Sequence, residues 1–297
     1  MSKVHYTHCP VCGSSDIHPL LTAKDHSVSG EEFVIWQCQS CTLRFTQDVP
    51  DESSIGPYYQ SQDYISHSNT SKGLLNKLYQ AVRKFTLGQK SGLVISRTTN
   101  QGRILDIGAG IGAFLNEMKH KGWDIEGIEP DYGARQQAKN LFDIGLKPTP
   151  ELKHLPHNSF DAITLWHVLE HVESLQDYVA LLKQLLKKDG RIFIAVPNYS
   201  SLDADLYGNR WAAYDVPRHL YHFTPRSLDV LVQKHGMKII ARKPMWFDAF
   251  YISLLSSKYR TGRTSWFGAG INGIRSNFKA LLNKEKASSL IYIISKD

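Results

Sequence analysis

The glycine-rich segment near the middle of the chain is the feature that most constrains its fold. Residues Asp106–Gly112 read DIGAGIG and lie between a short apolar run, 103–107, and a segment with helical spacing, 113–121. Glycines placed directly after a strand allow a sharp turn and let the backbone approach a bound ligand closely. The segment therefore predicts a strand–loop–helix unit that binds a ligand.

Strand-like and helix-like segments alternate through the rest of this region. We expect strands at 103–107, 123–128, 160–165, 191–196, 237–241 and 289–295, and helices at 113–121, 132–141, 169–186 and 225–235. Thr224 and Pro225 provide an N-cap and a proline at the first helical position. Repeated β-α-β units imply a parallel sheet that is covered by helices on both faces.

Further motifs follow the next strands. Glu129 lies at the tip of the second predicted strand, where an acid can bridge two ribose hydroxyls. The motif LPHNSFD (155–161) leads into the strand at 160–165, and LWHVLEHV (165–172) follows that strand. With the glycine loop, these motifs resemble those of the class I S-adenosylmethionine (SAM) dependent methyltransferases, over about residues 101–241 and the last strand. The resemblance implies an α/β Rossmann-like fold with a seven-stranded, mostly parallel sheet and helices on both faces.

The same resemblance assigns the cofactor site. The glycine loop would pass under the methionine end of SAM, Glu129 would hold the ribose, and Trp166 and His167 would lie where the strand opens toward the methyl group; a core position for Trp166 stays open. The spacing G-x-G-x-G differs from the dinucleotide pattern G-x-G-x-x-G. The residues assigned to the cofactor are Asp106, Gly108, Ala109, Gly110, Gly112, Glu129, Pro130, Trp166 and His167.

All four cysteines lie within the first 41 residues, as the pairs Cys9/Cys12 and Cys38/Cys41. Each CxxC turn can present two sulfurs to one ion, and four thiolates leave no open position for a substrate. We therefore expect a structural zinc ribbon. Residues 2–50 carry three Lys/Arg against five Asp/Glu, which argues against nucleic-acid binding by this module.

Changes in composition divide the chain into three parts. We expect a zinc-ribbon-like module at 1–50, an aromatic and helical linker and cap at 51–100, and a SAM-binding domain at 101–297 with insertions at about 198–223 and 244–287. No window is apolar enough for a spanning helix, and the first residues lack an apolar signal core. The expected location is the cytoplasm.

Two groups of residues are candidates for the acceptor side of the site. The first is His167, Glu170 and His171, whose spacing would place them on one face at the start of a helix. Ubiquinone-biosynthesis O-methyltransferases carry a similar acid-x-x-Glu-His cluster that is associated with a divalent cation, and here His167 replaces the first acid. The sequence leaves open whether this set binds a cation or only forms local hydrogen bonds.

The second group lies at 207–223, between a predicted strand and the next helix. It resembles a W-x3-D-x-P-R-H-L pattern of bacterial methyltransferases of unassigned substrate. An oxygen acceptor must lose a proton, so we expect His219 or His222 as the base, with Asp215 or Arg218 orienting it; a hydrogen-bonded lid is the alternative. The candidate catalytic residues are His219, His222, Asp215 and His167.

The net charge is +7, and residues 242–297, with ten Lys/Arg and three Asp/Glu, hold the whole excess. A basic tail suits an anionic partner or is a solvated surface. The aromatic residues that follow Trp246 have helical spacing. The predicted helix could be a cap, a homodimer surface or a peripheral membrane contact, and the sequence leaves these open.

We therefore predict a SAM-dependent methyltransferase that acts on oxygen of a small-molecule, lipid-linked or nucleotide-linked acceptor. One alternative is an RNA- or protein-modifying methyltransferase that uses the ribbon and the basic tail for docking. Another is a sugar C-methyltransferase, since such enzymes resemble this chain in placing a two-CxxC module before the SAM domain. The sequence does not identify the acceptor.

Overall fold

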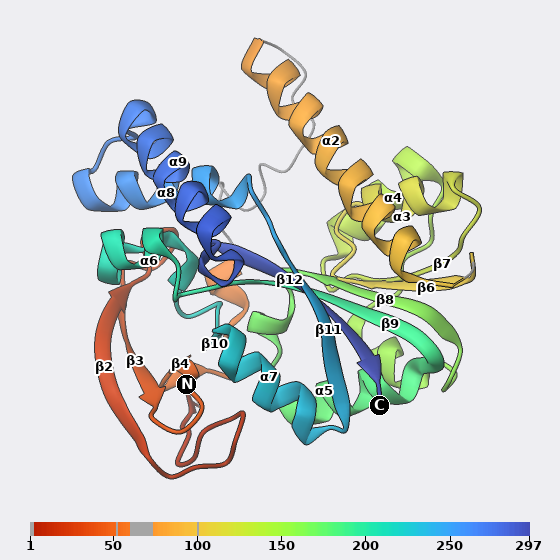
Figure 1. Ribbon diagram of the computed structural model, residues 1–297, viewed down its shortest axis with the longest axis horizontal. Helices are drawn as coiled ribbons and strands as arrows, with labels where there is room; N and C mark the ends of the chain where they lie inside the picture. Colours follow the sequence, from red (N-terminus) through yellow and green to blue (C-terminus); the bar gives the residue numbers. More distant parts are fainter. Residues whose placement is uncertain (1–2, 52, 60–73, 100) are drawn as a thin grey trace.

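The computed structural model describes residues 3–51, 53–59, 74–99 and 101–297. A large sheet runs through the centre with helices on both of its faces, and a smaller, strongly curved sheet from the N-terminal part lies beside it (Figure 1). This arrangement confirms the expected α/β Rossmann-like fold.

The large sheet has six named strands in the order β11-β12-β9-β8-β6-β7. The strands are β6 (Arg103–Ile107), β7 (Asp124–Ile128), β8 (Phe160–Trp166), β9 (Leu186–Pro197), β11 (Met237–Pro244) and β12 (Ser289–Lys296). The pairs β7–β6, β6–β8 and β8–β9 are parallel. Strand β12 is antiparallel to both β9 and β11.

The described sheet thus has one strand fewer than the seven expected. Beyond β7, the chain pairs through a single parallel bridge between Ile128 and Lys147. The next residue is Pro148, which has no N–H to donate, and the chain then enters the 3-10 helix η2 (Thr149–His154). The ladder therefore stops after one residue, and no edge strand forms there.

Helices cover both faces of this sheet. Helices α2 (Leu74–Arg97), α3 (Ala113–His120) and α4 (Tyr132–Phe142) lie on one face, and α5 (Leu175–Leu185) and α7 (Pro225–Lys234) lie on the other (Figure 1). The predicted cap of α7 is present, because the Thr224 hydroxyl accepts from the Ser227 N–H.

The helix expected at 169–186 is split. Only a short 3-10 turn, η3 (Leu169–His171), follows β8, and α5 begins after Ser174. His167 has a φ of 60°, which keeps it out of a right-handed helix, and Val172 ends the 3-10 turn in an extended conformation with a φ of −77° and a ψ of 134°. The chain therefore leaves β8 through a tight bend before it can form α5.

The small sheet contains a strand from a distant part of the chain. It consists of β2 (Ile17–Lys24), β3 (Glu32–Cys38), β4 (Arg44–Thr46) and β10 (Tyr221–His222), and two further strands, β1 (Lys3–Val4) and β5 (Val49–Pro50), pair with each other. Strand β10 is antiparallel to β4, with Tyr221 opposite Phe45. The N-terminal sheet is therefore completed by the segment that follows β9.

The rest of the chain forms short elements and a helical hairpin. The short elements are η1 (Gly56–Tyr59), α6 (Leu202–Tyr207), η4 (Gly208–Arg210), η5 (Ala212–Tyr214) and η6 (Lys284–Lys286), and the hairpin is α8 (Asp248–Thr261) and α9 (Trp266–Leu282). Helices α8 and α9 lie side by side at the upper left of Figure 1. Among the described residues, no helix combines the length and apolar composition that crossing a membrane requires.

A buried carboxylate ties this hairpin to the segment that follows β9. Asp203 of α6 is fully buried and accepts from Trp211 Nε1 at 2.8 Å and from the Ser276 hydroxyl of α9 at 2.8 Å. A third bond comes from the Ser288 hydroxyl just before β12. One side chain thus joins four segments through hydrogen bonds to a charged group.

We expect the substitution Asp203→Ala to lower the free energy of unfolding by about 3 kcal/mol, because it leaves buried donors without an acceptor. Urea denaturation followed by circular dichroism measures the change. The matched control is Asp205→Ala on the exposed side of the same helix, which should change stability by less than about 0.5 kcal/mol. Equal effects of the two variants would contradict a special role for the buried network.

Candidate active site and metal centre

The glycine loop is held at the carboxyl end of the sheet by its own backbone. The N–H groups of Gly108 and Ala109 both donate to the Ile128 carbonyl, at 2.8 and 3.0 Å. Gly108 and Gly110 have φ values of 71° and 54°, which favour glycine. A Cβ at Gly108 would lie 2.4 Å from Val168 Cγ2, whereas a Cβ at Gly110 would meet nothing within 4 Å. The backbone at Gly110 therefore faces open space.

Glu129, at the end of β7, contacts this loop directly. One carboxylate oxygen accepts from the Gly110 N–H at 2.7 Å and the other accepts from the Asp131 N–H at 3.0 Å. Burial raises the pKa of Glu129, and these two hydrogen bonds oppose the shift. The Pro130 carbonyl accepts from Arg135 at 2.7 Å. The structure thus brings together the loop and the acid that the sequence assigns to one cofactor.

Asp106 lies beneath the loop. It is 1% exposed and accepts from the Thr164 hydroxyl of β8 at 2.6 Å. Burial raises the pKa of Asp106 to about 7, against the opposing effects of Thr164 and Lys90. Behind the loop, Gly112 precedes α3 with a φ of 77°. Both residues support the loop from below and behind.

Trp166, at the end of β8, is half-buried between two other elements. The Lys90 ammonium lies 4.5 Å from its ring centroid, and the Phe114 ring packs edge-on at 5.4 Å. Burial lowers the pKa of Lys90, and Asp248 and Asp106 oppose the shift. Sequence reasoning did not find Lys90, because nothing in the sequence shows that α2 crosses this end of the sheet.

His167 bridges two carboxylates. Its Nε2 lies 3.1 Å from Asp248 of α8, and its Nδ1 lies 3.4 Å from Glu170. Burial alone would lower the pKa of His167, but the two carboxylates outweigh it and raise the pKa to about 9. Asp248 was also missed as a site residue. Its signal in the sequence is a single acid that interrupts the apolar run at 246–255.

A compact cluster forms from Glu170, His171 and His219, whose ligand atoms lie within 4.8 Å of one another. His171 Nδ1 lies 2.9 Å from the Arg218 carbonyl, and His219 Nδ1 lies 2.8 Å from the Ala213 carbonyl. A carbonyl only accepts hydrogen bonds, so both rings carry a proton on Nδ1, and the neutral form of each ring has its lone pair on Nε2. The structure therefore replaces His167 with His219 in the set that the sequence proposed.

Glu170 is the unusual member of this cluster. It is 0% exposed, and neither carboxylate oxygen has a hydrogen-bond partner among the described residues. Burial works to raise its pKa, but the neighbouring histidines, His167 above all, outweigh it and hold the pKa below the ordinary value. The nearest cationic partner is His167, whose Nδ1 lies 3.4 Å from one oxygen, so this buried carboxylate is only weakly compensated, which is costly in a native protein. Its chemistry, with two imidazole lone pairs, suits a divalent cation.

The remaining candidates lie on either side of this cluster. Asp215 binds Arg218 through a 3.0 Å hydrogen bond to Nε, and one of its oxygens lies 3.9 Å from His219 Nε2. His222 lies in β10, is 3% exposed and contacts the Thr46 hydroxyl at 3.1 Å. Burial lowers the pKa of His222 well below its ordinary value. The structure thus places His222 within the small sheet, apart from the cluster.

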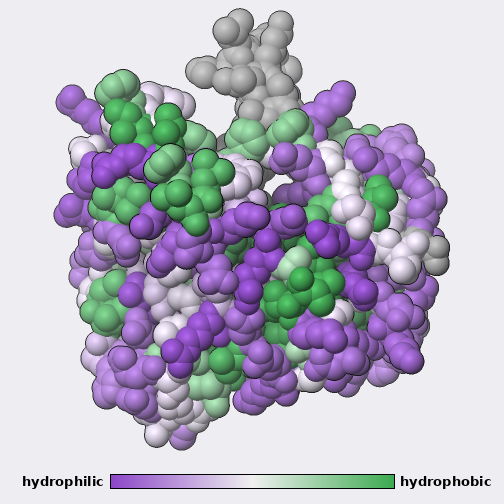
Figure 2. Space-filling model, viewed as in Figure 1, coloured by the Kyte–Doolittle hydropathy of each residue, from purple (hydrophilic) through white to green (hydrophobic). Residues whose placement is uncertain are grey.

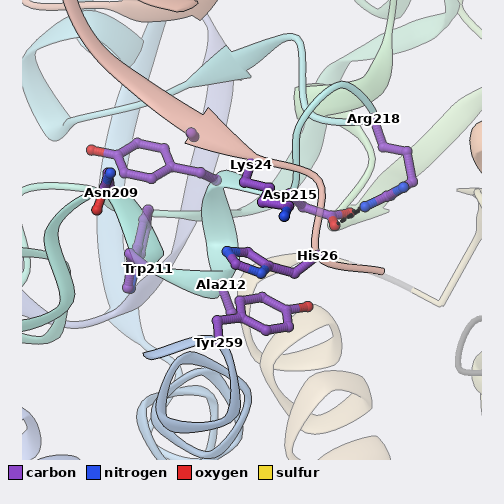
Figure 3. Close-up of a pocket in the computed structure, with 10 residues that line it drawn as sticks. Lys24, His26, Asn209, Trp211, Ala212, Asp215, Arg218 and Tyr259 are labelled. Carbon is purple, nitrogen blue, oxygen red and sulfur yellow. Dashed lines mark hydrogen bonds and ion pairs between the residues drawn. The ribbon is translucent and has the colours of Figure 1, made fainter. Parts of the chain in front are cut away.

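Arg218 and Asp215 also border a small pocket between the end of β2, the segment at 209–218 and α8. Figure 3 shows both side chains beside Lys24, His26, Trp211 and Tyr259. The His26 ring stacks on Tyr259 of α8, with centroids 4.4 Å apart. This contact brings the turn after β2 against α8.

The four cysteines converge, as their spacing predicts. Their ligand atoms lie within 4.8 Å of one another, and the Sγ atoms of Cys9 and Cys41, and of Cys12 and Cys38, are 3.5 Å apart. A disulfide would require about 2.05 Å, whereas tetrahedral Zn–S bonds of about 2.3 Å place sulfurs roughly 3.8 Å apart. The geometry is compatible with a zinc ion.

Comparisons with known proteins were made with this geometry in hand. A family profile described as a methyltransferase domain matches residues 77–242. The ubiquinone biosynthesis O-methyltransferase of Nitrosococcus oceani is 28% identical over 175 residues, a match covering 54% of this chain and 72% of that protein. Its mitochondrial counterpart from Bos taurus is 26% identical over 164 residues, covering 50% of this chain and 44% of that protein.

Solved structures share the fold at low identity. A magnesium protoporphyrin IX methyltransferase from Synechocystis PCC 6803 superposes with a TM-score of 0.52 at 14% identity, covering 83% of this chain and all of that one. A putative sarcosine dimethylglycine methyltransferase from Galdieria sulphuraria gives 0.50 at 12% identity, covering 75% of this chain and 88% of that one. Similarity at these identities establishes the fold alone.

Proposed function

The chain belongs to the family of methyltransferase domains, and on this basis we propose that it transfers a methyl group from SAM to a hydroxyl oxygen of a small-molecule or lipid-linked acceptor. The observation that carries the proposal is the contact between the Glu129 carboxylate and the Gly110 N–H at the carboxyl end of the parallel strands. The similarity to ubiquinone biosynthesis O-methyltransferases supports oxygen as the methylated atom.

We assign the cofactor to the open side of the glycine loop. Gly110 has no neighbour on that side, so the backbone can approach a ligand closely. Glu129 is held by two backbone N–H groups and keeps further lone pairs that could accept from ribose hydroxyls. Trp166 and His167 follow on the neighbouring strand end. Methyl transfer is an in-line displacement, so their task is to align the reactants and exclude water.

On the acceptor side, His219 Nε2 can act in one of two ways. It can take the proton of the acceptor hydroxyl, as the sequence suggests, or it can bind a cation, but one lone pair cannot do both at once. The fully buried Glu170 carboxylate makes only a 3.4 Å ion pair with His167 and faces both His171 and His219, which favours the second role. We therefore propose that Glu170, His171 and His219 hold a divalent cation. A bound cation would supply Lewis acidity that lowers the pKa of an acceptor hydroxyl.

We also propose that the four cysteines hold a structural zinc ion. Cys9, Cys38 and Cys41 are buried, and Gln176 of α5 donates to the carbonyls of Pro10 and Val11 in the first knuckle. Four thiolates fill the coordination shell, which leaves zinc no place for a substrate. The ion would hold the small sheet against α5.

The cofactor assignment is tested by calorimetric titration with SAM and with its demethylated product. We expect Glu129→Ala to weaken binding by about 30-fold, because two hydrogen bonds to ribose are worth about 2 kcal/mol. Gly110→Arg should abolish binding, since its side chain enters the open space at a φ of 54°. Glu117→Ala, on the outer face of α3, is the matched control and should bind normally. Folded protein that binds neither ligand would overturn the assignment.

The cation proposal is tested by Mn²⁺ titration of zinc-loaded protein, followed by electron paramagnetic resonance. We expect one bound Mn²⁺ per chain, and its loss in Glu170→Gln and in His171→Gln. His154→Gln, at an exposed position outside the cluster, should bind Mn²⁺ normally. The cation proposal fails if radiolabelled methyl transfer to a quinol proceeds without divalent cations and is lost in His219→Gln. That result would make His219 the base.

The zinc proposal predicts about one zinc per chain by elemental analysis, and loss of that zinc in Cys12→Ser. The variant should unfold at a clearly lower urea concentration, because metal-binding free energy contributes to folding. Ser40→Ala, between the two cysteines of the second knuckle, serves as the control, since a serine hydroxyl there is not a ligand, and should retain zinc. A protein that is metal-free as isolated and equally stable with and without added zinc would contradict a structural ion.

A further inference from the structure

Helix α9 presents large apolar side chains to solvent. Phe267, Ile271, Ile274, Phe278 and Leu281 recur at intervals of four and three residues, which aligns them along one face, here called the α9 stripe. Their exposed fractions run from 41% to 83%. Figure 2 shows apolar side chains gathered at the upper left, where Figure 1 places α8 and α9. Exposed apolar patches of this kind mark interaction sites.

The opposite face of α9 explains why these residues are not needed for the core. The face that packs on the protein consists of the small residues Ala269, Gly273, Ser276 and Ala280, all buried. A Cβ at Gly273 would lie 2.5 Å from the Phe250 ring of α8. The two helices therefore pack closely through small residues, and the large apolar side chains point away from the molecule.

The surroundings of the stripe are basic. Residues 249–284 contain six Lys/Arg and no Asp or Glu. Arg275 and Lys279 are exposed on α9 itself, and Lys258, Arg260 and Arg263 are exposed at the end of α8 and in the turn that follows. Apart from Asp248, which begins α8 and faces His167, the hairpin thus combines an apolar face with positive charge.

These two properties select the occupant. A symmetric dimer through this face would bring the positive charge of one hairpin against that of the other, which opposes association. A bilayer that contains anionic lipid offers an apolar interior for the stripe and phosphates for the Lys and Arg side chains. We propose that the α8–α9 hairpin docks on an anionic membrane surface, with the α9 stripe inserted at the level of the lipid headgroups.

The position of the hairpin gives this docking a consequence for the active site. Helix α8 begins at Asp248, whose carboxylate lies 3.1 Å from His167 at the end of β8. The hairpin is therefore joined, through the first residue of α8, to the proposed acceptor side of the site. The docking itself does not depend on the proposed function, but a membrane-docked enzyme would meet a lipid-linked acceptor where that acceptor resides.

The test is flotation of the full-length protein with vesicles of phosphatidylcholine, with or without about one-third phosphatidylglycerol. We expect binding to the anionic vesicles only, lost steeply on adding salt. Phe267→Ser with Phe278→Ser, and separately Arg275→Glu with Lys279→Glu, should each weaken binding by about tenfold or more. Circular dichroism and SAM titration of the same variants report whether the fold and the cofactor site are intact.

Matched controls come from other exposed positions. Leu20→Ser with Leu141→Ser removes comparable exposed apolar side chains, and Lys119→Glu with Lys188→Glu makes the same change of charge. Both double variants should bind vesicles like the parent protein. Equal binding to neutral and anionic vesicles, no binding to either, or equal losses in controls and hairpin variants would overturn the proposal. So would a dimer, detected by light scattering, that Phe267→Ser with Phe278→Ser dissociates.

Discussion

The buried guanidinium of Arg218 holds together the parts of this protein that lie far apart in the sequence. It donates to Asp215 beside it, to Asp25 in the turn after β2, and to the carbonyl of Tyr58. Its own carbonyl accepts from His171, which lies beside Glu170 and His219. A guanidinium that is 2% exposed is costly unless such partners satisfy it. The acceptor side of the site therefore depends on the N-terminal module being in place.

The same dependence is visible in the backbone around Arg218. The N–H of Leu220 donates to the Glu170 carbonyl at 2.8 Å, and Tyr221 and His222 pair with β4 of the small sheet. His219 thus sits between a segment tied to the methyltransferase sheet and a segment tied to the cysteine-bearing sheet. Proper docking of the cysteine module would set the position of His219, so a structural metal in one part can influence chemistry in another.

The two ends of the site are built differently. The cofactor end depends on local sequence, because a strand, a glycine loop and a helix follow each other directly and Glu129 follows the next strand. The proposed acceptor end is assembled from β8, the segment after β9, α2 and α8, which no local pattern brings together. The cofactor end can be identified from consecutive residues. The proposed acceptor end can be identified only when it is known how loops cross the end of the sheet.

Charge and apolar surface also have separate origins. The excess of positive charge after residue 241 is visible in the sequence, as is the helical spacing of apolar residues. The sequence does not show which side of α9 faces solvent. Both faces of that helix lack acidic residues, and one of them carries small side chains. Packing of Gly273 against Phe250 decides the orientation and turns the large side chains outward.

The sequence by itself determined the α/β fold, the loop at Asp106–Gly112 with its acid Glu129, the cysteine cluster, and, to within a few residues, the boundaries of most strands of the large sheet and of α3, α4 and α7. These features arise from short-range periodicity and from residue types with one dominant role. Only the tertiary structure decided that the expected seventh strand stops at a single bridge, that His219 rather than His167 joins Glu170 and His171, and that Asp248 and Lys90 reach the site. The left-handed conformation of His167 turns the chain after β8, and Pro148 ends the pairing beyond β7. The contacts of Asp248 and Lys90 join residues far apart in the sequence, so no local pattern encodes them.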